Sequence, residues 1–134
     1  MILRRDSAML DHIDFAVRDL EASRRFYSST LAALDIEPFR NIKTDEGREG
    51  TGYGKLTGSQ FWIGKGEAVK GRMHIAFAAK SRKAVDEFYE IALQVGGLSK
   101  GAPGVRPHYG EHYYAAFVID SDGHTIEAVC RGAE

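Results

Sequence analysis

The chain has 134 residues, of which 43% are hydrophobic and 28% charged, a composition typical of one soluble globular domain. A formal net charge of −1 gives no reason to expect nucleic acid or a membrane surface as a partner. Its apolar runs are too short to span a bilayer, its N-terminus lacks a signal-like apolar core, and its one cysteine cannot form an internal disulfide. We therefore expect a cytoplasmic protein in which Cys130 is inert.

The first half of the chain has alternating strand and helix patterns. Residues 10–17 alternate in polarity, which predicts a strand with an apolar back and a front that presents His12 and Asp14. Asp19 is a suitable N-cap for a helix over residues 20–34, where apolar residues recur at helical spacing. The segments expected next are a strand at 36–42, a polar glycine-rich loop at 43–52, and strands at 53–57 and 59–63 that form a hairpin around Gly58.

The second half repeats this order. Residues 73–79 predict a strand whose front carries His74, and Ser81 can cap a helix that runs to about Val95 and ends at Gly96-Gly97. In the strand predicted at 125–130, Thr125, Glu127 and Val129 share one face. The remaining expectations are a mixed loop and short strand at 98–111, a strand at 112–119, and a turn at 121–124 that exposes His124.

A fixed offset of 62 residues relates the two halves. HIDFAV at 12–17 recurs as HIAFAA at 74–79, and the same offset continues through both predicted helices. Such an offset indicates an internal duplication. We predict one α+β domain over residues 1–134, built from βαβββ modules at 9–64 and 72–130. Together the modules would form a curved, mostly antiparallel sheet with the helices on its convex side.

Three ligand-type side chains fall on the predicted front of this sheet: His12, His74 and Glu127. Imidazole and carboxylate groups bind Fe²⁺, Mn²⁺, Zn²⁺, Ni²⁺ or Co²⁺, and three such ligands leave positions open for substrate. A histidine in a strand is more often simply a hydrogen-bonded polar residue. Glu127 favours a site, because a carboxylate in an interior strand is costly unless it is paired, coordinated or hydrated.

HIDFAV, the helical RRFY, HIAFAA and FVIDSDGHTIEAV together resemble the vicinal-oxygen-chelate superfamily. The superfamily includes glyoxalase I, extradiol dioxygenases, methylmalonyl-CoA epimerase, and the fosfomycin and bleomycin resistance proteins. The resemblance implies paired βαβββ modules and a divalent ion held by His12, His74 and Glu127. It also implies a homodimer and a small substrate that chelates the ion through neighbouring oxygens, with lyase, isomerase, thiol-transferase or dioxygenase chemistry.

One position departs from the pattern of glyoxalase I. Aligning Gly58 with Gly123 places Trp62 where Glu127 lies in the second half, and an indole cannot bind a metal ion. A His–His–Glu set instead resembles that of extradiol dioxygenases and of the fosfomycin-modifying thiol transferases. The alternative is a metal-free protein that binds a drug or metabolite, as the bleomycin resistance relatives do.

Further residues are candidates around this site. Trp62 is either a core aromatic or a cavity wall for substrate, and Asp14 is a candidate to orient a ligand. One of Tyr113 and Tyr114 should face the cavity and donate a hydrogen bond or a proton, although the alternation does not decide which. His112, and likewise His108, can reach the site from a loop as an acid or base.

Overall fold

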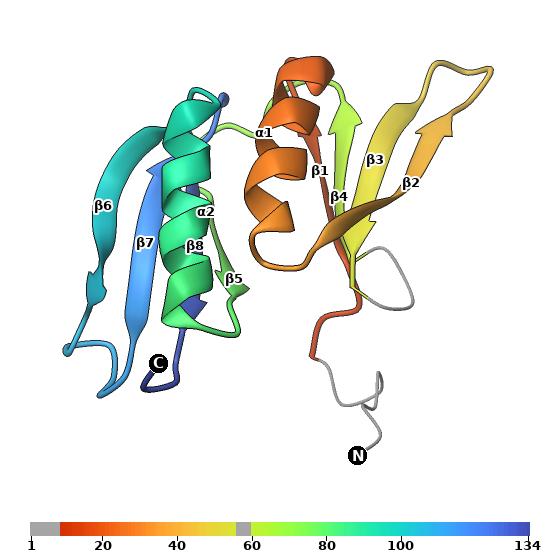
Figure 1. Cartoon of the computed structure of the whole chain (residues 1–134). Helices are drawn as coiled ribbons and strands as arrows, with labels where there is room; N and C mark the ends of the chain where they lie inside the picture. The colour runs from red at the N-terminus through yellow and green to blue at the C-terminus, as the bar shows by residue number, and fades with distance from the viewer. Residues whose placement is uncertain (1–8, 56–59) are drawn as a thin grey trace.

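The structure is a computed structural model of the whole chain, which describes residues 9–55 and 60–134 (Figure 1). Gly58, the predicted centre of a hairpin, lies outside the described residues. The first module contains β1 (Ile13–Val17), α1 (Leu20–Ala32), β2 (Glu37–Lys43), β3 (Glu49–Gly54) and β4 (Phe61–Lys65). The second contains β5 (His74–Ala78), α2 (Arg82–Gln94), β6 (Leu98–Val105), β7 (Tyr114–Ile119) and β8 (Thr125–Cys130).

Each module forms a four-stranded mixed sheet of the same topology. The strand orders are β1-β4-β3-β2 and β5-β8-β7-β6; the first pair in each order is parallel and the others are antiparallel. The predicted α+β class and the two βαβββ modules are confirmed. Among the described residues, each module keeps its own hydrogen-bonded sheet. The two modules contact each other through side chains and helices.

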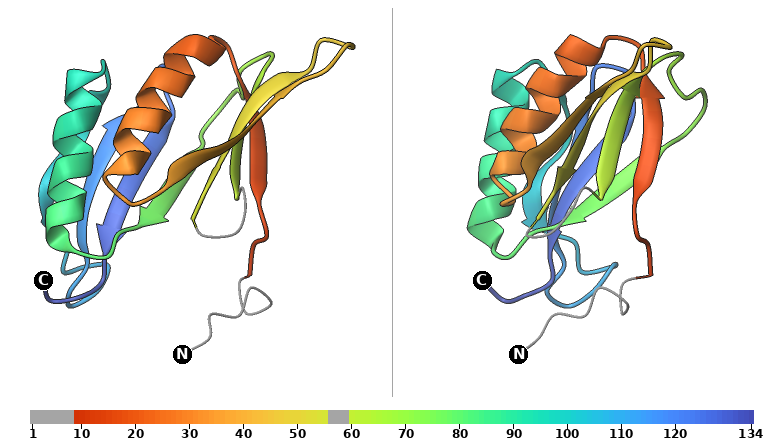
Figure 2. Two further views of the ribbon diagram at one scale, coloured as in Figure 1. Left: turned by 45° about the vertical axis from the view of Figure 1, so that its right-hand side comes forward. Right: turned by 90° about the vertical axis from the view of Figure 1, so that its right-hand side faces the viewer.

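The two helices begin as the sequence predicts. The carboxylate of Asp19 accepts from the backbone N–H of Ala22, and the Ser81 hydroxyl accepts from that of Ala84. Each helix packs on the sheet of its own module, and the two helices pack against each other (Figure 2). No described helix is long and apolar enough to cross a membrane. The sheet faces turned away from the helices are called the open faces below.

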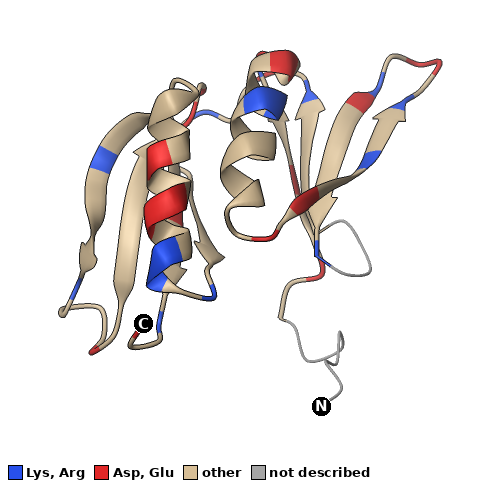
Figure 3. Ribbon diagram, viewed as in Figure 1, with Lys and Arg blue, Asp and Glu red and all other residues tan. Residues whose placement is uncertain are grey.

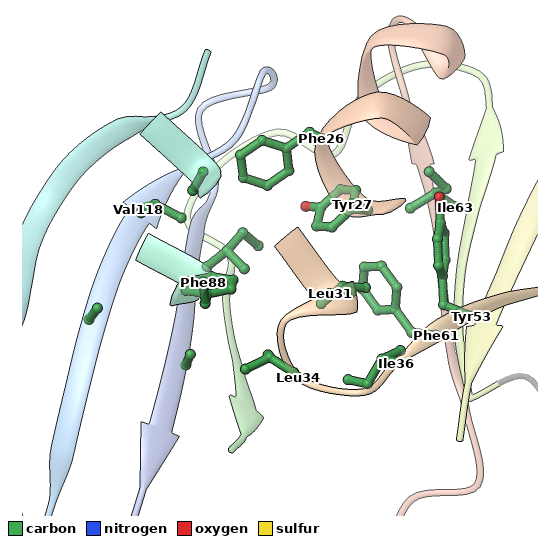
Figure 4. Close-up of a cluster of buried hydrophobic side chains, with 14 of the residues drawn as sticks. Phe26, Tyr27, Leu31, Leu34, Ile36, Tyr53, Phe61, Ile63, Phe88 and Val118 are labelled. Atoms are coloured by element: carbon green, nitrogen blue, oxygen red, sulfur yellow. The ribbon is translucent and has the colours of Figure 1, made fainter. Parts of the chain in front are cut away.

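One hydrophobic core joins the two modules. Side chains of α1 lie between the first sheet and the second module, with Tyr27 and Leu31 fully buried (Figure 4). The ring of Phe61 on β4 packs 5.1 Å from Tyr27 and 5.1 Å from Phe77 on β5, measured between ring centroids. The Tyr27 hydroxyl donates to the Asp120 carboxylate across the modules. The two halves therefore fold around shared aromatic contacts.

Two strands are longer than the sequence predicts. β3 takes up the last four residues of the expected loop at 43–52, and β6 takes up the first eight residues of the segment at 98–111. Both strands are rich in glycine, a residue that lowers strand propensity. At Gly50 the sheet itself requires glycine, because a Cβ there would lie 2.6 Å from the carbonyl oxygen of Ile63 on the paired strand.

Candidate metal centre

His74 and Glu127 form a contacting pair on the open face of the second sheet. His74 opens β5, and Glu127 lies on the neighbouring β8, paired with Ala76 two residues further along β5. The Nε2 atom of His74 lies 2.7 Å from Oε1 of Glu127. The Glu127 side chain is 3% exposed and that of His74 is 37% exposed. The alternation predicted for β8 is observed: Ile126 and Ala128 point into the core, and Glu127 points to the other face of the strand.

Tyr113 is hydrogen-bonded to the second oxygen of the Glu127 carboxylate. It lies immediately before β7, and its hydroxyl donates a hydrogen bond to Oε2 of Glu127. Burial, together with the hydrogen bond and the charge of Glu127, raises the pKa of Tyr113 to about 12. The phenol is therefore a proton donor at neutral pH. The next residue, Tyr114, points to the helix side and donates to Asp86 on α2.

The chemistry of this pair fits a divalent ion. One imidazole nitrogen and one carboxylate oxygen, 2.7 Å apart, are ordinary ligands for the metals considered above. Two ligands at about 2.1 Å from an ion and at right angles to each other are about 3 Å apart, close to the observed separation. A buried carboxylate also needs a cation or several donors to offset its desolvation. His74 and Glu127 therefore fit two positions of a metal site.

The third predicted ligand, His12, lies elsewhere in the chain. It is exposed immediately before β1, where its Nδ1 atom is 2.8 Å from a carboxylate oxygen of Asp11. In Figure 1, β1 begins at the lower end of its sheet and β5 begins at the upper end of the other. Among the described residues no three histidine, cysteine or carboxylate side chains are grouped to hold an ion. One chain thus brings together His74 and Glu127 but not His12.

The open face of the first sheet carries a hollow of about 190 Å³. Asp14 on β1 is paired with Trp62 on β4, and both side chains line this hollow. The neighbouring Phe15 is buried on the other face of β1. Trp62 is half-buried, as a wall residue would be. The hollow is also lined by three charged residues: Arg48 in the β2–β3 connection, Glu49 on β3 and Lys65 on β4.

The other histidines of the second module are dispersed. His112 is exposed in the turn before β7. The ring of His108 packs 4.1 Å from that of Tyr109, which in turn contacts Tyr113 at 5.3 Å, both measured between centroids. The expectation that His124 is exposed was wrong: it is 3% exposed, because its turn folds back and its backbone N–H donates to Asp120.

Three residues beside the His74–Glu127 pair were missed at the sequence level. Phe117 of β7 pairs with Glu127, and its ring lies 5.9 Å from that of His74. The guanidinium of Arg106 lies over the same phenyl ring, and the ammonium of Lys100 bonds Thr125 next to His74. The alternation of β7 could have identified Phe117. No sequence signal places Lys100 or Arg106, because both belong to the glycine-rich stretch that reads as a loop.

Comparison with known proteins agrees with this architecture. The sequence model of the glyoxalase/bleomycin resistance protein/dioxygenase superfamily matches residues 9–128. No curated protein sequence was found to match. A glyoxalase/bleomycin resistance protein from Albidiferax ferrireducens T118 is 27% identical, with a TM-score of 0.72 over 93% of this chain and 100% of that one.

Two further solved structures have the same fold. A glyoxalase-related enzyme from Fulvimarina pelagi is 25% identical, with a TM-score of 0.63 over 91% of this chain and 87% of that one. The fosfomycin resistance protein FosX from Listeria monocytogenes is 22% identical, with a TM-score of 0.66 over 92% and 93%. At this last level of identity the likeness shows the fold alone.

Proposed function

The chain belongs to the glyoxalase/bleomycin resistance protein/dioxygenase superfamily, and from this premise we propose that it is a divalent-metal-dependent enzyme. Its substrate is a small molecule that chelates the ion through two neighbouring oxygens. The observation that carries the proposal is the buried Glu127 carboxylate, which contacts His74 and Tyr113 on an open sheet face. A protein that only binds an apolar ligand gains nothing from this arrangement.

The third ligand of the proposed site is His12 of a second copy of the chain. His12 is exposed, and the open face that follows it carries Asp14, Trp62 and the hollow. A homodimer that sets this face against the open face of the partner's second sheet joins His12 to His74 and Glu127. The two-fold symmetry of a dimer would then form two such sites.

Each residue has a defined task in this proposal. When bound, the ion acts as a Lewis acid on the chelating oxygens of the substrate. Tyr113 keeps its proton at neutral pH, and its hydroxyl orients Glu127 and supplies a proton donor beside the substrate. Trp62 forms a wall against which the apolar part of the substrate packs, and Asp14 orients the substrate from the rim of the hollow. His112 is the loop residue proposed to reach the site as an acid or base.

Metal content tests the proposal. Protein purified without a histidine tag is loaded with Fe²⁺, Mn²⁺, Zn²⁺, Ni²⁺ or Co²⁺, desalted and analysed for bound metal. Wild-type protein should retain about one ion per chain, whereas Glu127→Gln and His74→Ala should lose it. His108→Ala is the matched control and should retain the ion, because His108 packs on Tyr109 and is not one of the proposed ligands. Equal metal content in all four proteins would contradict the proposal.

The second candidate function is a metal-free binding protein. It is favoured by one observation: a single chain does not group three ligand-type side chains among the residues that the structure describes. In that case the His74–Glu127 contact would be an ordinary hydrogen-bonded pair. The same metal analysis separates the two functions, because the binding protein would hold no stoichiometric ion in any variant.

A further inference from the structure

The guanidinium of Arg106 fills a space on the second sheet that is free because Gly101 and Gly104 have no side chains. This guanidinium lies 5.4 Å above the centre of the Phe117 ring, and Nη2 donates to the carbonyl oxygen of Ala102 at 2.6 Å. A Cβ at Gly104 would lie 2.9 Å from Nη1, and one at Gly101 would lie 3.2 Å from Nη2 and 3.0 Å from Phe117. Neither glycine has a positive φ, so their role here is to provide space for the guanidinium.

A second cation lies on the same face. Lys100 projects from an irregularity in β6, and its Nζ atom donates to Oγ1 of Thr125 at 2.8 Å. Thr125 pairs with His74 and precedes Glu127 by two residues, so it shares their face of the sheet. Arg106 and Lys100 thus lie on the same face of the sheet as the His74–Glu127 pair. Lys100 is on β6 and Arg106 directly follows it, where Figure 3 marks basic residues.

Neither cation has a carboxylate partner among residues 9–55 and 60–134. Within the described chain no carboxylate lies within 4.0 Å of Lys100 or Arg106. A guanidinium has five N–H donors, and the one bond to Ala102 leaves donors for a ligand. Two unpaired cations, one of them held rigidly on an aromatic ring, favour binding of an anion.

We propose that Arg106 and Lys100 form an oxyanion subsite, which binds a carboxylate or phosphonate group of the substrate beside the His74–Glu127 pair. The proposal deepens the proposed function, because it defines the substrate as a small acid. The planar guanidinium fits the two oxygens of such a group bidentately, and the ammonium adds a point charge. His74 and Arg106 both contact Phe117, so this ring separates the anionic group from the metal ligands.

Anion binding to the metal-free protein tests this subsite independently of the ion. Malonate and methylphosphonate are titrated separately into EDTA-treated protein. NMR follows the backbone amide resonances of Phe117 and Thr125, which every variant retains, and in proteins that keep Arg106 also its Nε–Hε resonance. The shifts of these resonances should saturate with at least one probe, and the Kd should rise with ionic strength. The probe with the lower Kd identifies the preferred oxyanion.

Matched variants locate the binding. Arg106→Gln and Lys100→Gln should each raise the Kd about ten- to hundredfold, whereas Lys83→Gln on α2 removes the same charge and should leave it unchanged. Gly104→Ala keeps every charge but crowds Nη1, so it should also weaken binding. Each variant is first compared with the wild type by circular dichroism to verify folding.

The outcomes separate this proposal from the proposed function. Saturable anion binding that is lost in Arg106→Gln supports the subsite even if no metal is retained. No saturable binding of either probe, or the same Kd in Arg106→Gln as in wild type, overturns the subsite even if the metal site is present.

Discussion

Trp62 and Glu127 occupy equivalent positions in the two modules. Trp62 pairs with Asp14 on β1, Glu127 pairs with Ala76 on β5, and Asp14 and Ala76 are related by the 62-residue offset of the internal repeat. The two open faces therefore differ at one corresponding point, which is an indole in the first module and a carboxylate in the second. We infer that this position supplies a wall in the first module and a ligand-type carboxylate in the second.

The adjacent aromatic residues Phe61 and Trp62 should differ sharply in their contribution to stability. Phe61 is 3% exposed and packs on Tyr27 and Phe77, whereas Trp62 lines the hollow. Phe61→Ala should lower the free energy of unfolding by about 3–5 kcal/mol. Trp62→Ala should lower it by about 1 kcal/mol or less. Urea unfolding followed by circular dichroism measures both. An equal loss would assign Trp62 to the core.

The phenol of Tyr113 should respond to the charge of Glu127. Its raised pKa of about 12 arises first from burial and then from the hydrogen bond and charge of Glu127. Glu127→Gln removes the charge and should lower this pKa toward its ordinary value near 10, while burial keeps it somewhat elevated. NMR titration of ¹³Cζ-labelled tyrosine, assigned with Tyr113→Phe, measures the change. Tyr114 is the internal control, because it bonds Asp86 on the other face.

Sequence patterns were sufficient for most of the fold and for two residues that the structure brings together, His74 and Glu127. Alternation assigned the faces of β1, β5 and β8 correctly, because each strand has one face in the core. Cap residues located both helix starts, since Asp19 and Ser81 satisfy exposed N–H groups locally. These features depend on short-range chemistry, which a sequence displays directly.

Features that depend on long-range packing were not predictable in this way. The glycines at 50, 101 and 104 were interpreted as loop residues. In the structure, the absence of a Cβ lets the paired strand lie close to Gly50 and makes room for the guanidinium of Arg106 at Gly101 and Gly104. Alternation also could not separate Tyr113 from Tyr114, because the register of β7 decides their faces. Equivalent positions in a repeat likewise do not establish that His12 meets His74, since this depends on how two modules are placed in space.

The buried hydroxyl of Tyr27 should make the protein sensitive to alkali. Burial, and then the negative charge of Asp120, raises the pKa of Tyr27 well above its ordinary value of 10. Above about pH 10 the unfolded chain ionises this phenol while the folded chain does not, so stability falls by about 1.4 kcal/mol per pH unit.

Tyr27→Phe isolates this effect. The variant loses the hydrogen bond to Asp120 and should be less stable by about 2 kcal/mol at pH 7. This deficit should shrink between pH 10 and 11, because the variant has no phenol to ionise at this position. Urea unfolding at both pH values measures it, and a constant deficit would contradict the raised pKa.

The proposed assembly of the metal site from two chains makes a quantitative prediction for mixed dimers. His12→Ala and His74→Ala should each abolish metal retention when purified alone. In a heterodimer of the two variants, one site lacks both histidines, whereas the other combines the intact His12 of one chain with the intact His74 of its partner. Random mixing gives half heterodimers, so about a quarter of all sites should regain an ion.

Unfolding the two variants together, refolding them and measuring retained metal tests this outcome. Each variant refolded alone is the control for recovery and should remain metal-free. If both histidines of a site came from the same chain, mixing would restore nothing, because every chain would carry one defective ligand. The result therefore distinguishes a shared site from one within a single chain, a distinction that the exposed position of His12 makes necessary.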